Sequence, residues 1–166
     1  MKILPQDYVQ AAKERIVQAE ANFEQEHFAL AMDTAGRAVE CILRAYFFQK
    51  HGAEATLEAA HDIPKLFKDS GLKAAFLKAK EGRSASEAAI TQHSRQLEVD
   101  IADIVLRWSN DYRYASEDRL RKHLKRKGLD RKVKGNYLRD NARKLIEAAR
   151  RVVNEGTERW SHSKRK

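Results

Sequence analysis

The sequence predicts an all-α fold, an up-and-down bundle of four long helices with additional short helices, and two observations support this prediction. Its 166 residues include only two Pro and seven Gly, while the residues that enter helices at the lowest cost, Ala, Leu, Glu, Lys and Arg, are abundant. Apolar residues recur every three or four positions, and no segment of useful length alternates with period two. This period is typical of helices that bury one face in a bundle.

The helical period and the capping signals place the elements along the chain. Long helices are expected at about 5–23, at 26–50, from a capping box at Ser84 and Glu87 to about 108, and at 136–154. Short helices are expected at 61–71 with Asp62 as N-cap, at about 72–79, and from Ser116 to Gly128. In the helix that ends near 108, the expected inward residues are Ile90, Leu97, Ile101, Val105 and Trp108. Residues 1–160 are expected to form one domain, followed by a disordered basic tail at 161–166.

Positive charge is concentrated in the last third of the chain. Residues 116–166 contain 18 Lys and Arg against 7 Asp and Glu, a net charge of +11, so residues 1–115 carry −2 of the total of +9. A basic third on a nearly neutral body favours a polyanionic partner.

Other features exclude several classes of protein. Cys41 is the only cysteine, so no internal disulfide can form, and a reducing cytoplasmic location is expected. No apolar run approaches the ~18 residues of a membrane span, and no signal peptide is expected in the first residues. The six histidines lack metal-ligand spacing, and no glycine-rich phosphate loop is present, so neither a metal nor a cofactor is expected.

Four segments occur in a recognisable order. They are the central helix with AGRAVECILRA at 35–45, the His61-Asp62 segment, the long helix that leads to NDYRY at 110–114, and the last helix with ARKLIEAA at 142–149. Together they resemble the HEPN superfamily of helical domains. The resemblance covers roughly residues 8–154, with an inserted basic stretch at about 117–135.

The resemblance implies a test for ribonuclease activity. HEPN relatives that cut RNA do so without a metal, and they carry an Arg, four to six residues, and then a His near the end of a long helix; dimerisation brings two such pairs together. Here Arg107 is present, but Tyr112 occupies the expected His position. His123 is too far from Arg107, and only three residues separate it from Arg119. A Tyr with a pKa near 10 is a poor proton shuttle at neutral pH, which favours a binding domain over a nuclease.

The turn after the long helix supports two interpretations. Its candidate RNA-binding residues are Arg107, Asn110, Tyr112, Arg113 and Tyr114. In one interpretation the arginines bind phosphates and a tyrosine stacks on a base. In the other, Trp108 and Tyr112 pack in the core and the arginines form ion pairs that hold the helix end.

The inserted stretch and two polar positions leave similar alternatives. The further candidates for phosphate contact are Lys122, Lys125, Arg126, Lys127, Arg131 and Lys132, although a charged helix face is often only solvated. His61 either lines the same groove or simply precedes the cap Asp62. Arg37 either pairs with Glu40 at i, i+3 or faces a dimer groove.

Three functions follow from the sequence. The leading one is a HEPN-type RNA- or nucleotide-binding module, a homodimer in a toxin–antitoxin or defence context, with an antitoxin or other protein as a further partner. The alternative is a metal-independent endoribonuclease with Arg107, Arg113 and His61 as candidate catalytic residues. The third is an adaptor whose basic end docks an acidic protein.

Overall fold

A computed structural model describes residues 3–57, 61–81, 87–131 and 133–163. Within these ranges the chain is mostly helical and contains no strand. The elements are α1 (Pro5–Glu24), α2 (Phe28–His51), α3 (Ile63–Ser70), α4 (Leu72–Glu81), α5 (Glu87–Arg107), the 3-10 helix η1 (Asn110–Tyr114), α6 (Glu117–Arg126) and α7 (Tyr137–Ser163). The predicted all-α class is confirmed. No helix in the described ranges is both long and apolar enough to cross a membrane.

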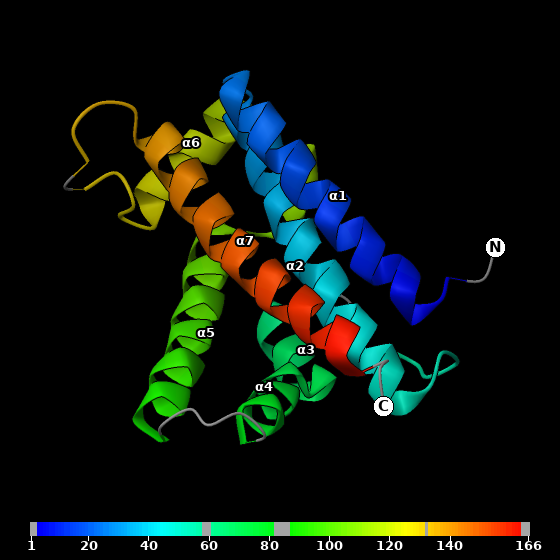
Figure 1. Cartoon of the computed structure of the whole chain (residues 1–166). Coiled ribbons are helices and arrows are strands. Elements are labelled where there is room, and N and C mark those ends of the chain that lie inside the picture. The colour runs from blue at the N-terminus through cyan, green and yellow to red at the C-terminus, as the bar shows by residue number, and fades with distance from the viewer. Residues whose placement is uncertain (1–2, 58–60, 82–86, 132, 164–166) are drawn as a thin grey trace.

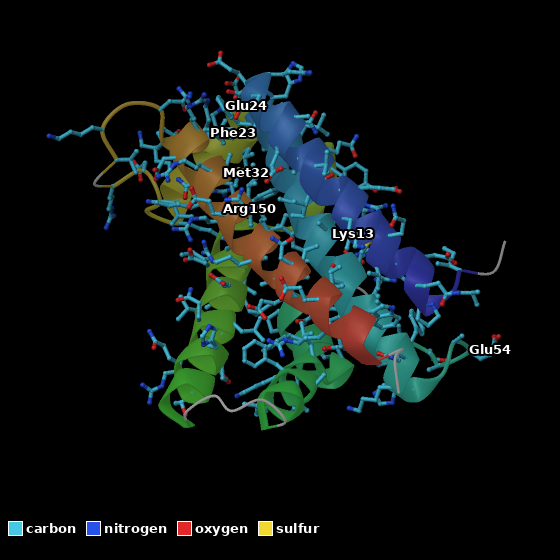
Figure 2. All side chains as sticks on the ribbon, viewed as in Figure 1. Lys13, Phe23, Glu24, Met32, Glu54 and Arg150 are labelled. Carbon is cyan, nitrogen blue, oxygen red and sulfur yellow. The ribbon has the colours of Figure 1, made fainter. Side chains whose placement is uncertain are left out.

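Helix α2 is the central element of the bundle. Fifteen of its 24 residues are buried, so it has no continuous solvent-facing side. It packs against α1, α7, α3 and η1, and Figure 1 shows α1 and α7 running along it. At the surface, Arg150 of α7 (Figure 2) forms an ion pair of 3.4 Å with Glu20 of α1. The burial of α2 on several sides fits its central place in the bundle.

Local signals explain where several short elements begin and end. The Asp62 carboxylate accepts a hydrogen bond from the backbone N–H of Lys65 at 3.0 Å, which caps α3 as expected. Gly71 follows α3 with φ 74°, a left-handed conformation that glycine adopts without steric cost. The Ser116 hydroxyl accepts from the N–H of Arg119 at 3.3 Å and starts α6. Leu120 and Leu124 then anchor α6 in the core.

Two sequence-based expectations require correction. Val105 is 37% exposed and Ile104 is buried in its place, because successive steps of three and four residues from Ile101 lead to Ile104 and then to Trp108. Helix α7 continues to Ser163, past the expected end at 154 and three residues into the segment expected to be disordered. Trp160 supports this extension, since its buried ring packs edge-on against Tyr46, with centroids 5.4 Å apart. The rest of the tail, the serines of the expected capping box and the Ile90 side chain lie outside the described part of the chain.

Candidate nucleic-acid interface

The end of α5 is fixed by a contact between an indole and a glycine. Trp108 is buried, and its ring lies directly over Gly36 of α2. The Ser109 hydroxyl then accepts from the N–H of Asp111 at 3.4 Å and starts η1. The turn that carries the candidates Asn110, Tyr112, Arg113 and Tyr114 is therefore held against the central helix.

Three residues of this segment serve the core, as the second interpretation of the turn proposed. Arg107 is only 8% exposed, and its Nη1 donates to Asp103 Oδ1 at 2.6 Å. Tyr112 is 5% exposed, and burial raises the pKa of its hydroxyl to about 12. Trp108, the residue that follows Arg107, is also buried. Base stacking on Tyr112 would require the turn to move.

Arg113 and Tyr114 are presented to solvent on the same turn. Tyr114 is 75% exposed, the largest exposed fraction among the exposed large hydrophobic side chains of the described residues. The Arg113 guanidinium carbon lies 4.8 Å from the centroid of the Tyr114 ring. An exposed phenol ring with a guanidinium over it is a suitable platform for a nucleic-acid base.

Four cations of α6 have no counter-ion within the described ranges. Among the described residues, none of their side chains forms an ion pair or a hydrogen bond. They line one open hollow, and we call them the α6 cationic face: Arg119, Lys122, Lys125 and Arg126. By contrast, Arg121 on the same helix is paired with Glu117 at 2.7 Å.

A second hollow lies between η1 and α6 and shares two of these arginines. This η1–α6 pocket has a volume of about 330 Å³. It is lined by Ser109, Asp111, Tyr112, Tyr114, Ala115, Arg119, Leu120, His123 and Arg126. Because Arg119 and Arg126 line both hollows, the pocket opens next to the α6 cationic face.

His123 enters this pocket from α6 and meets Tyr112. The two rings lie edge to face with centroids 5.8 Å apart. Burial, together with the charges of Lys127 and Arg126, lowers the pKa of His123 below its usual value. The structure thus places an imidazole from α6 next to Tyr112, the residue at the expected His position.

Buried polar atoms without hydrogen-bond partners are concentrated here. Within the described residues they include Arg107 Nε, Trp108 Nε1, Asn110 Oδ1, Tyr112 Oη and His123 Nε2. Such atoms are destabilising and rare in folded proteins, and where they gather they often mark a functional site.

The remaining predicted basic residues have mixed roles. Lys127 Nζ donates to the backbone carbonyl of Leu106 at 2.9 Å, so it caps the end of α5, and burial lowers its pKa. Arg131 is exposed in the loop before α7, next to Gly128. Lys132 lies outside the described residues.

His61 belongs to a separate polar cluster. Its Nδ1 lies 3.0 Å from the buried Glu40 carboxylate, which also pairs with Arg44 at 2.5 Å. Arg37 pairs with Asp33 at 2.8 Å, so the expected Arg37–Glu40 pair is wrong. Asp33 and Glu40 each pair with the arginine four residues later, Arg37 and Arg44. Neither His61 nor Arg107 lines the η1–α6 pocket. In the described ranges, no three His, Cys, Asp or Glu side chains are placed to hold a metal ion.

The contact between His123 and Tyr112 was not predicted from the sequence. A signal was present, because Arg119, His123 and Arg126 are spaced by four and three residues and so share one face of α6. Nothing in the sequence placed that face beside η1, since the contact joins two separate elements.

These features define an all-α helical-bundle domain with a cationic helix beside an aromatic turn. The HEPN domain family model matches residues 5–160, and the chain belongs to this family. Comparisons with curated proteins and with solved structures find no match. HEPN domains are in general RNA-binding or nuclease-like modules.

Proposed function

We propose that this chain is an RNA-binding module of the HEPN type that holds a single strand on the α6 cationic face and the exposed part of η1. The observation that carries the proposal is that the four α6 cations, next to the exposed Tyr114, have no counter-ion in the part of the chain that the structure describes. Cations without partners inside the protein can bind phosphates directly, whereas a paired cation such as Arg107 must first break its ion pair.

The dimensions of the face suit a nucleic-acid strand. Arg119 and Arg126 are seven residues apart, which corresponds to about 10 Å along a helix at about 1.5 Å per residue. This length allows more than one phosphate of a strand to be contacted at the same time. Arg113 and Tyr114 extend the surface with a stacking platform, and Arg131 lies in the loop that follows α6.

The sequence-based candidates fall into two groups, residues proposed to contact RNA and residues proposed to hold the turn and α6 in place. Arg113, Tyr114, Lys122, Lys125, Arg126 and Arg131 are the proposed contact residues, together with Arg119. Arg107, Asn110, Tyr112 and Lys127 are proposed to hold the turn and α6 in place. Lys132, outside the described residues, stays a candidate on sequence grounds alone.

Binding of a short single-stranded RNA across a salt series tests the proposal. Raising KCl from about 50 to about 200 mM should weaken the affinity steeply, with a log–log slope of about −0.7 for each phosphate neutralised. Weak affinity that salt leaves unchanged would contradict binding through phosphates.

The two alternative functions remain distinguishable from RNA binding. For metal-independent cleavage, two of the three sequence candidates, Arg107 and His61, are already held by the carboxylates of Asp103 and Glu40. Cleavage of RNA by the protein in the presence of EDTA would support this activity. That cleavage should then be lost in the Arg107→Ala variant. An adaptor that docks an acidic protein would share the salt dependence but would bind that protein in preference to RNA.

Homodimerisation is part of the proposal and is supported by an apolar strip on α5. Val99 and Leu106 are seven residues apart, on one face of the helix, and are 56% and 41% exposed. Exposed apolar residues on one face are suited to an interface with a second copy. Sedimentation equilibrium should give twice the monomer mass. We propose a cytoplasmic toxin–antitoxin or defence system as the setting, with the single Cys41 in keeping with a reducing compartment.

A further inference from the structure

The η1–α6 pocket contains an acid, which the α6 cationic face does not. Asp111 lines it together with Arg119 and Arg126, yet its carboxylate has no ion-pair or hydrogen-bond partner among the described residues. The hydroxyl of Ser109 lies beside it on the same turn. One side of the pocket therefore provides cations and the other provides hydrogen-bond acceptors.

This combination restricts the chemistry of a ligand. A bare phosphate would gain from the two arginines but would be repelled by Asp111. A ligand with a hydroxyl donor next to its phosphate would satisfy both sides, because a carboxylate only accepts hydrogen bonds and a guanidinium only donates them. In a nucleic-acid strand, the group that fits this description is the ribose 2′-hydroxyl.

The rim of the pocket provides a third element of recognition. Tyr114 lines the pocket and is largely exposed, so a base next to the sugar can pack on its ring. Stacking of this kind tolerates all four bases. The pocket thus presents a cationic end, an acceptor end and an aromatic rim within a volume of about 330 Å³.

We propose that the η1–α6 pocket binds one ribonucleotide of the strand, with its phosphate on Arg119 and Arg126 and its 2′-hydroxyl donating to Asp111. This inference rests on the proposed function, since the α6 cationic face supplies most of the affinity. It adds a property that a face of cations alone does not have, because phosphates are the same in RNA and DNA. The domain then distinguishes RNA from DNA.

The test compares three oligonucleotides of one sequence and length, oligouridylate, oligodeoxyuridylate and the 2′-fluoro analogue. The fluoro analogue keeps an RNA-like sugar but lacks the donor, so it separates sugar shape from hydrogen bonding. The wild-type chain should bind the ribo form roughly tenfold more tightly than the other two, as expected for a hydrogen bond to a charged acceptor.

Asp111→Ala and Asp118→Ala form a matched pair of variants. Asp118 is exposed at the start of α6, does not line the pocket, and carries the same charge. Both substitutions remove one negative charge near the strand, so both should tighten binding of the deoxy form. Only Asp111→Ala should bring the ribo-to-deoxy ratio close to one.

The outcomes separate this inference from the proposed function. Equal wild-type affinity for the three oligonucleotides, or a preference for the ribo form that survives Asp111→Ala, would overturn the ribonucleotide pocket. In either case steep salt dependence would still support binding on the α6 cationic face. If no oligonucleotide binds in a salt-dependent way, both proposals are wrong.

Discussion

A Cβ atom placed on Gly36 would lie 2.1 Å from Cδ1 of Trp108, so the middle of α2 and the end of α5 meet without space for a methyl group. This contact positions the chain just before η1. The exposed ring of Tyr114 and the α6 cations therefore depend on a buried contact in another part of the domain.

Gly36→Ala should destabilise the fold. Helix propensity alone favours Ala over Gly by about 1 kcal/mol in a helix interior, so without the contact the substitution would be stabilising. Overpacking against a buried ring costs about 1–3 kcal/mol and reverses the sign. Urea unfolding gives the answer directly, and an increase in stability would mean that Trp108 does not lie over Gly36.

Arg107→Met should reduce stability and leave RNA affinity nearly unchanged. The substitution breaks the 2.6 Å pair with Asp103 while keeping most of the side-chain volume. Because Asp103 is partly exposed, we expect a loss of about 1–2 kcal/mol, less than for a fully buried pair. Thermal unfolding and RNA titration should be measured on the same preparation. A tenfold loss of affinity at unchanged stability would show that Arg107 contacts phosphate.

Tyr114→Ala should weaken RNA binding without affecting the fold. The side chain is exposed, so little packing is lost, whereas stacking on a base contributes about 1–3 kcal/mol. Tyr114→Phe keeps the ring and is the matched control. We expect at least a fivefold weaker affinity for the Ala variant and near wild-type affinity for the Phe variant in fluorescence anisotropy. Equal affinities for all three proteins would exclude a stacking role.

The stability of the domain should decrease as the pH falls, partly because of His123. Burial lowers its pKa from the usual 6.5, so the unfolded chain takes up the proton more readily than the folded one. This contribution is present above pH ~6.5 and is lost as the pH falls below it. Between pH ~7.5 and ~5.5, His123→Gln should therefore lose less stability than the wild type in urea unfolding. Equal losses of stability for the two proteins over this pH range would contradict the buried position of His123 against Tyr112.

The sequence predicted the helices well because their signals are local. The period of apolar residues and the caps at Asp62 and Ser116 depend only on neighbours within one turn. In α5 the misplaced core residue, Val105, lies a single position from Ile104, and two adjacent apolar residues look alike in such a pattern.

The candidate site was predicted less well, because burial and pairing depend on partners. Asp103, four residues before Arg107, was the available sign that this arginine is paired within its own helix. The packing of Tyr112 against His123, and the hollow shared by η1 and α6, arise from contacts between separate elements. A single sequence without structure does not contain these distances.

The slope of log affinity against log salt for a single-stranded RNA tests the central claim most directly when Lys122 and Lys125 are replaced together by Ala. If these residues contact phosphates, the slope should become less steep by about 1.4, or about 0.7 for each lysine. The control is a variant in which Lys13 and Lys68 are both replaced by Ala. Both lysines are exposed on other helices, and Figure 2 labels Lys13 on α1. This control should leave the slope unchanged. Equal slopes for the two double variants would contradict the α6 cationic face as the RNA-binding surface.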